Sequence, residues 1–178
     1  MWPMPHFDDF DFSSFWMSHP YALKNYTDAP CTPEVVAAVE DALGYTLPSA
    51  YVALATRHNG GMPSRTAHRT PSRTSWAADH VAVSGIFSIG QHKDCSLSGR
   101  TGSRFFIDDW GYPPIGVYFA DCPSAGHDML CLDYRACGPH GEPAVVHVDQ
   151  ECGYAITPVA PDFESFIRGL QSHRDFAA

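Results

Sequence analysis

SAGHDMLCLDYRACGPHGEPAVVHVD, at residues 124–149, contains two apolar runs separated by a loop rich in glycine and proline. The runs, residues 129–134 and 144–148, have the length and the Leu and Val content of β-strands. The loop between them is too short for the crossover that parallel strands require. This stretch therefore predicts two antiparallel strands that lie side by side.

Further short apolar runs with turn residues between them follow His80. They lie at residues 81–83, 86–89, 105–107, 115–120 and 154–159. No gap after His80 is both long enough and periodic enough to hold a crossover helix, so an antiparallel meander is favoured. We predict a single antiparallel sheet of about six strands.

Three helices are expected around this sheet. The first begins after Thr32, a good N-cap, and its apolar stripe ends at Gly44. The second begins near Ser49, and the last follows Asp162 with apolar residues at i, i+3, i+4 and i+7. Helices, then strands, then a helix predict an α+β fold with the helices packed against the sheet.

The chain of 178 residues has the size of one ordinary domain. Residues 1–30 are rich in Phe, Asp and Pro and predict an N-terminal arm with a short helix among residues 7–16, whose aromatic side chains pin it to the domain. Residues 31–178 are expected to form the single domain. Within it, residues 62–78 predict a long surface loop that carries several arginines.

The formal net charge is −9, with 20 acidic residues against 11 Lys and Arg. Such a surface repels phosphate backbones and anionic lipids, so we expect no direct nucleic-acid or membrane partner, while a basic protein would be attracted. No leader peptide or membrane span is evident, which predicts a cytoplasmic location. The six cysteines lack a CxxC pair and are expected to be free thiols.

His127 and Asp128 are the sharpest candidates for chemistry, since an imidazole beside a carboxylate can act as a base or bind a metal. The interpretation that we favour is a turn in which Asp128 bonds local backbone N–H groups and His127 anchors the turn. A hydrolase remains the alternative. Its residues would be Asp121, His127, Asp128, Asp133 and His147.

A zinc site could be built from Cys137, His140, His147 and Cys152, which have suitable residue types but poor spacing. His147 alternates with two valines and is expected to face the other way, on a side of the sheet that is only partly buried. Common catalytic fingerprints are missing from the sequence. We therefore predict no catalytic residue, no metal site and no cofactor.

The segment DDWGYPPIG, residues 108–116, is expected to join two strands and to place a large aromatic residue beside two carboxylates. Exposed, Trp110 would serve as an interaction anchor with acids that select a basic partner. The alternative is that Trp110 folds back over the core. We predict a partner-binding surface made of these residues: Asp108, Asp109, Trp110, Tyr112, Asp121, His127 and Asp128.

Several segments occur in a fixed order along the chain. They are GYTLPSAY (44–51) with HNGG (58–61), SGIFSIG (84–90), DDWGYPPIG (108–116), the stretch at residues 124–149, and APDFESFIRGL (160–170). In this order the chain resembles the SUKH superfamily from about Pro30 onward. The resemblance implies the family's α+β fold. It also implies a protein-binding role, most often that of a bacterial immunity protein that neutralises a toxin of the nuclease or deaminase class. A cytosolic regulatory or adaptor domain without a toxin partner is the other implied role.

Overall fold

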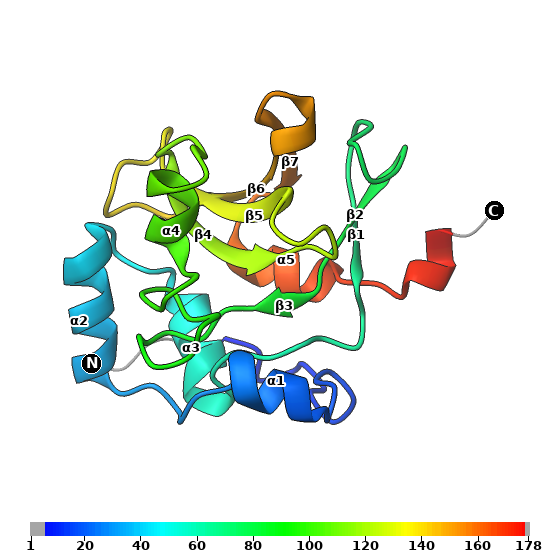
Figure 1. The fold of residues 1–178 in the computed structure, drawn as a ribbon. Helices are drawn as coiled ribbons and strands as arrows, with labels where there is room; N and C mark the ends of the chain where they lie inside the picture. Colours follow the sequence, from blue (N-terminus) through cyan, green and yellow to red (C-terminus); the bar gives the residue numbers. More distant parts are fainter. Residues whose placement is uncertain (1–5, 177–178) are drawn as a thin grey trace.

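The computed structural model describes residues 6–176 and shows a central antiparallel sheet of five strands. Helices surround this sheet (Figure 1). The α+β class is thereby confirmed. In spatial order the strands are β3 (Gly85–Ile86), β4 (Gly116–Asp121), β5 (Asp128–Asp133), β6 (Ala144–Asp149) and β7 (Ala155–Ala160).

A separate two-stranded ribbon corrects the prediction of one sheet. β1 (Ala67–Arg69) pairs with β2 (His80–Ala82), and neither strand joins the larger sheet. β1 lies inside the segment that was expected to be entirely loop. Its other edge is bonded to the C-terminal region, because Ala67 and Gln171 exchange both backbone hydrogen bonds at 3.0 and 2.8 Å.

Residues 105–107 are the second correction, because they lie in helix α4 (Ser103–Asp108) and not in a strand. A run of three apolar residues is too short for its period to distinguish the two structures. The Ser103 side chain fixes the helix to the sheet, since its Oγ accepts a hydrogen bond from the Tyr118 amide at 2.9 Å. Residues 109–115 consequently join a helix to β4.

The three helices expected from the sequence are all present: α2 (Pro33–Leu43), α3 (Ser49–Arg57) and α5 (Phe163–Gly169). Thr32 caps α2 by accepting from the Val35 amide, and Gly44 ends it with a left-handed φ of 81°. The Asp162 carboxylate caps α5 by accepting from the Ser165 amide at 2.7 Å.

Aromatic contacts join α3 and α5 to the sheet. Tyr51 of α3 stacks on Phe163 of α5 with ring centroids 4.4 Å apart, and both rings contact Phe119 of β4 edge-on. All three side chains are buried, so one core lies between these helices and the sheet. The remaining elements are short: α1 (Pro20–Asn25), η1 (Gln150–Cys152) and η2 (His173–Phe176).

The described part of the N-terminal arm packs onto the domain. Phe7 and Phe15 are buried in the same core as the sheet. Within residues 6–30 the short helix of the arm is α1, which lies after residue 19, while turns occupy residues 7–16, where the aromatic spacing had placed it. Residues 1–5 of the predicted arm lie outside the described residues.

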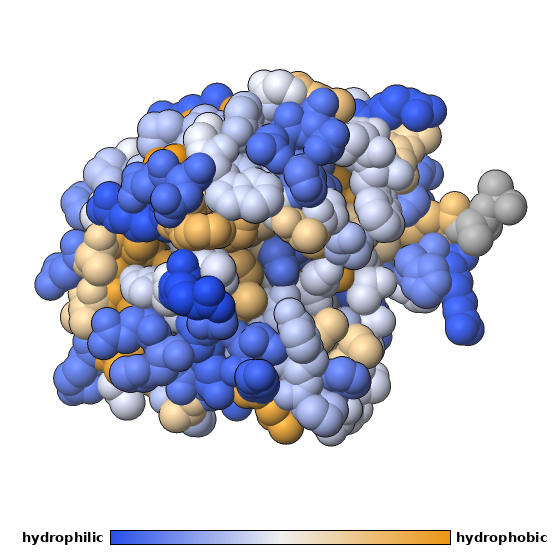
Figure 2. All heavy atoms as spheres, viewed as in Figure 1, coloured by the Kyte–Doolittle hydropathy of each residue, from blue (hydrophilic) through white to orange (hydrophobic). Residues whose placement is uncertain are grey.

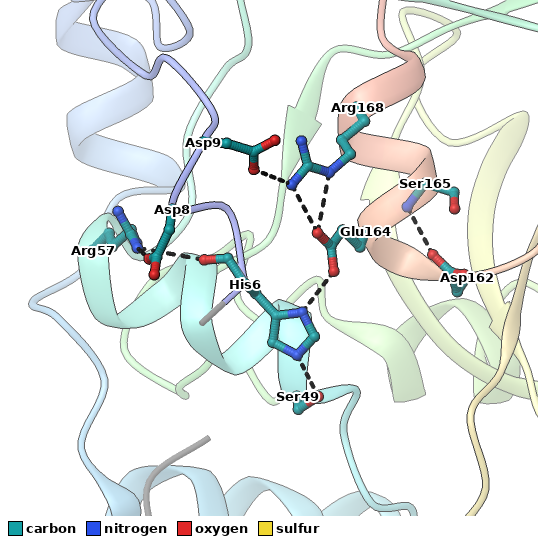
Figure 3. Close-up of polar contacts among 9 residues, drawn as sticks. All are labelled: His6, Asp8, Asp9, Ser49, Arg57, Asp162, Glu164, Ser165 and Arg168. Carbon is teal, nitrogen blue, oxygen red and sulfur yellow. Dashed lines mark hydrogen bonds and ion pairs between the residues drawn. The ribbon is translucent and has the colours of Figure 1, made fainter. Parts of the chain in front are cut away.

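A polar cluster also fastens the arm (Figure 3). Arg168 of α5 bonds Asp9 at 2.7 Å and Glu164 at 2.9 Å, while Arg57 of α3 bonds Asp8 at 2.9 Å. His6 bridges the two helices, with Nδ1 2.6 Å from Glu164 Oε2 and Nε2 2.8 Å from Ser49 Oγ. These contacts tie the arm to α3 and α5 at once.

The order Ser49, His6, Glu164 matches that of a nucleophile, a base and an orienting carboxylate. However, Arg168 shares the Glu164 carboxylate and offsets the negative charge that such a relay needs. The hydrogen bond from His6 and that from Arg168 lower the pKa of Glu164, although partial burial raises it. The cluster therefore serves as the anchor of the arm.

Replacing Arg168 with alanine is expected to loosen the arm, because Asp9 and Glu164 lose their shared partner. Limited proteolysis should then cut within residues 6–19 several-fold faster than in the wild-type protein. Arg135→Ala is the matched control, since within the described part of the chain the Arg135 guanidinium bonds only the local Asp133. Equal cleavage of both variants would show that the aromatic contacts alone hold the arm.

Candidate functional site

The end of α4 presents two acidic side chains to solvent. Asp108 and Asp109 are exposed, and within residues 6–176 neither carboxylate forms an ion pair. Trp110 follows them and is half-buried. Because unpaired carboxylates and a partly exposed indole are neighbours here, this part of the surface suits a basic partner.

The Trp110 ring packs across the turn before β5. It contacts the His127 ring edge-on, with centroids 5.6 Å apart, and lies against Gly126. The backbone carbonyl oxygen of Trp110 accepts a hydrogen bond from the Tyr154 hydroxyl at 2.5 Å. The backbone of Trp110 is thus held in place, while one side of the indole faces solvent.

His127 connects this region to η1. It is exposed, and its Nδ1 lies 2.9 Å from both Gln150 Oε1 and Glu151 Oε1. Glu151 was not predicted from the sequence, because only the fold brings η1 next to the turn. We refer to Asp108, Asp109, Trp110, His127 and Glu151 as the acidic end.

Tyr112 does not belong to this exposed set, which corrects the expected surface. Its side chain is buried, and its hydroxyl donates to the Gly126 carbonyl at 2.6 Å. The ring meets Tyr118 of β4 edge-on, and burial raises the pKa of Tyr112. Tyr112 therefore supports the loop that carries Trp110 from within the domain.

Asp128 is buried as well, so its predicted place on the surface is also corrected. Its carboxylate lies 2.7 Å from His147 Nε2, and its other oxygen bonds the Ser124 hydroxyl. The Ser124 hydroxyl in turn accepts from the Asp128 amide at 3.0 Å. The favoured turn is present, but its carboxylate bonds two side chains rather than local N–H groups.

His147 is fully buried, with 0% of its side chain exposed, whereas the alternation of the strand predicted partial burial. Both faces of β6 are covered, which is why alternation did not reveal an open side. The hydrogen bond to Asp128 joins β5 to β6 inside the domain. His147 Nδ1 has no partner among residues 6–176.

Asp121 lies mostly inside the domain, at the end of β4. The Tyr26 hydroxyl lies 2.7 and 2.9 Å from its two carboxylate oxygens. Burial raises the pKa of Asp121 to about 6, although the hydrogen bond from Tyr26 lowers it. Asp121 thus fixes α1 to the sheet and is not part of the acidic end.

The alternative hydrolase is not assembled. His127 and Asp128 are adjacent in sequence but face solvent and core respectively. Asp133 is engaged by Arg135 at 2.7 Å, and Asp121 by Tyr26. The five residues proposed for that enzyme are therefore not gathered at one site: Asp128 and His147 contact each other inside the domain, and the other three lie in separate contacts.

The candidate zinc set is not brought together either. The group of possible ligands found within residues 6–176 consists of Cys122, Asp128 and His147, whose ligand atoms lie within 4.8 Å of one another. Asp128 and His147 already bond each other, and burial with the nearby Asp128 carboxylate raises the pKa of Cys122, which favours the neutral thiol. A buried hydrogen-bonded cluster accounts for this group.

An apolar hollow of about 300 Å³ lies beside α2, on the face seen in Figure 2. Its lining includes Val35 and Val39 of α2 and Ile89. None of the residues of the acidic end lines it. The hollow and the acidic end are thus separate features.

None of the helices within residues 6–176 is long and apolar enough to cross a membrane. No curated protein matches the chain. The model of the SMI1 / KNR4 family (SUKH-1) does match it, over residues 30–169. This match spans most of the chain and agrees with the α+β fold and its antiparallel sheet. The chain belongs to the SMI1 / KNR4 family (SUKH-1).

Proposed function

We propose that this protein is a non-enzymatic binding domain, and that it acts in the cytoplasm as an immunity protein against a cognate toxin. Membership of the SUKH family, which includes toxin-immunity proteins that bind their toxins, supports this role. Of the five residues of the alternative hydrolase, Asp121, His127 and Asp133 are engaged in separate contacts, and Asp128 bonds His147 inside the domain.

The acidic end is the observation that carries the proposal. The exposed Asp108 and Asp109 precede a half-buried indole that contacts His127, and His127 in turn bonds Glu151, in a protein with a net charge of −9. A basic toxin domain of the nuclease or deaminase class would meet an anchor and matching charge there. Tyr112, Asp121 and Asp128 act from inside the domain by holding its loops in place.

The gene neighbourhood provides the first test. An immunity gene normally lies directly downstream of its toxin gene, so the product of the adjacent upstream reading frame is the protein to use. We expect it to form a one-to-one complex with this chain in isothermal titration, which abolishes its toxicity. A gene far from any toxin, with a regulatory protein as its partner, would favour the adaptor role.

Trp110→Ala is expected to weaken that complex by about 2 kcal/mol or more, roughly thirtyfold in Kd. The reason is that the indole is the only large aromatic side chain in the acidic end. The melting temperature should fall only modestly, because Tyr112 and Phe106 still fill the core beneath it. A large fall in melting temperature with unchanged binding of the folded fraction would instead assign Trp110 to the core.

The paired change Asp108→Asn and Asp109→Asn tests the charge separately. Association should slow and should lose part of its dependence on salt, while dissociation changes little. Asp94→Asn serves as the control, since Asp94 is an exposed carboxylate outside the acidic end that pairs with Arg100. An equal effect of both changes would point to net charge rather than to this surface.

A further inference from the structure

A second hollow lies between the β1–β2 ribbon and the C-terminal helix η2, with a volume of about 540 Å³. Volumes of this size are typical of sites that receive a ligand or a few side chains. Its walls come from segments far apart in the sequence, namely the arm, the ribbon and η2. The principal apolar residues that line it are Met17, Met62, Ala82, Trp76, Val83 and Phe176.

Two of these side chains are well exposed. Trp76 is 46% and Met17 43% exposed, and they are among only five large apolar side chains within residues 6–176 that are so open to solvent. Tryptophan and methionine are enriched at protein interfaces, where an indole offers a rigid anchor and a thioether adapts to its partner. Their convergence on one hollow favours a binding site over scattered exposure.

An arginine, Arg69, lies beside one wall of this hollow. Ala67 and Ala82 line the hollow and pair with each other across the ribbon. Arg69 lies two residues after Ala67, and His80 two residues before Ala82, so both are on the same face as the alanines. The Arg69 guanidinium lies 5.0 Å from the centre of the Phe176 ring, which forms one wall. Arg69 is exposed, and its ion pair with the exposed carboxylate of Asp79 is long, at 3.9 Å.

The charge of this region contrasts with that of the whole protein. Residues 62–80 contain three arginines and one aspartate, whereas the complete chain carries −9. Arg65 and Arg73 are exposed like Arg69. The hollow therefore combines apolar walls with His80, His173 and the nearby Arg69, beside a segment that is more basic than the chain as a whole.

We propose that this groove binds an acidic peptide segment of a protein partner, with a bulky apolar side chain seated against Trp76 and Phe176 and a carboxylate on Arg69. The chemistry is opposite to that of the acidic end, which suits a basic surface. In Figure 1, α4 and the β1–β2 ribbon lie on different sides of the molecule. The groove is therefore a second site, and the proposal does not rest on the toxin-binding role.

The test uses the full chain and fluorescein-labelled octapeptides in anisotropy titrations. One set alternates Asp or Glu with Leu, Phe or Trp. Two matched sets replace either the acidic residues with Lys or the apolar residues with Ser. We expect members of the first set to bind at least about tenfold more tightly than both matched sets, and more weakly as salt rises.

Variants then locate the site. Trp76→Ala should weaken binding of the best peptide about tenfold or more, and Arg69→Gln about three- to tenfold. Both residues are exposed, so the melting temperature should stay close to that of the wild-type protein. Tyr21→Ala and Arg100→Gln, at exposed positions outside the groove, are the matched controls and should leave binding unchanged.

Several results would overturn the proposal. These are the absence of binding across the acidic set, equal binding of the Lys set, or binding that Trp76→Ala and Arg69→Gln leave intact. Binding to phosphatidylserine vesicles but to no peptide would assign the groove to a membrane surface. Self-association that Trp76→Ala abolishes would assign it to a second copy of the chain. Trp110→Ala should not affect peptide binding. A negative result with the peptides would therefore leave the proposed toxin-binding role of the acidic end untouched.

Discussion

Replacing Asp128 with alanine is expected to lower the free energy of unfolding by about 3–5 kcal/mol, the range seen when one partner of a buried pair is removed. Asp128 and His147 have 3% and 0% of their side chains exposed, and their hydrogen bond is 2.7 Å long. The variant leaves the His147 Nε2 and the Ser124 hydroxyl inside the domain without this acceptor. Denaturant unfolding at neutral pH measures the effect.

Two further variants separate the cause. Asp128→Asn keeps the size of the side chain and one acceptor oxygen, so its cost should be smaller than that of alanine. Adding His147→Ala to Asp128→Ala should cost less than the sum of the single changes, because the two residues share one interaction. His127→Ala, the exposed neighbour, should change stability by less than about 0.5 kcal/mol. If the effects of Asp128→Ala and His147→Ala were additive, the two residues would contribute to stability independently of each other.

The Asp128–His147 contact also shows what the sequence could and could not predict. The two strands were predicted as antiparallel neighbours, and the sheet confirms this. The register, with Leu130 opposite His147, brings Asp128 diagonally next to His147 on one face. That register is fixed by packing and turn geometry along both strands, which no local pattern reveals.

Helices were predicted well where capping and periodicity agree. Thr32 and Gly44 bound α2, and Asp162 begins α5, as expected. Residues 105–107 were assigned wrongly, because three apolar residues fit a strand and a short helix equally well. β1 was missed since it has three residues, and its pairing with β2 and with Gln171 is a property of the tertiary fold.

The candidate surface was predicted in part. Asp108 and Asp109 are exposed as expected, and Trp110 lies between the two alternatives, half-buried with its backbone bonded by Tyr154. An aromatic residue in a turn looks the same in sequence whether it faces solvent or the core. Tyr112 is buried because its hydroxyl finds the Gly126 carbonyl, a partner that becomes adjacent only after folding.

The opposite charges of the two surfaces suggest how one acidic domain could use both. The acidic end carries the carboxylates of Asp108 and Asp109, which form no ion pair within residues 6–176, whereas the exposed Arg69 lies beside the groove. Surfaces of opposite sign on one molecule select different partners and disfavour the wrong one by repulsion. Binding at one site need not compete with binding at the other, and the Trp76→Ala and Trp110→Ala variants separate the two.

Asp121→Asn is expected to remove a loss of stability that accompanies rising pH. Burial raises the pKa of Asp121 to about 6, from an ordinary value of 3.8. Between these values the folded protein holds a proton that the unfolded chain has released, so this contribution is complete below pH 3.8 and is lost as pH rises through about 6. The loss amounts to about 2–3 kcal/mol.

The asparagine cannot ionise, and its carbonyl oxygen still accepts from Tyr26. The variant should therefore be more stable than the wild-type protein at neutral pH and nearly equal to it near pH 4. Denaturant unfolding across this range, with the wild-type curve subtracted, isolates the contribution. Asp94→Asn is the control, because Arg100 lowers the pKa of that exposed carboxylate, whereas burial raises the pKa of Asp121. A difference between wild type and Asp121→Asn that does not change with pH would mean that Asp121 remains charged beneath Tyr26 throughout.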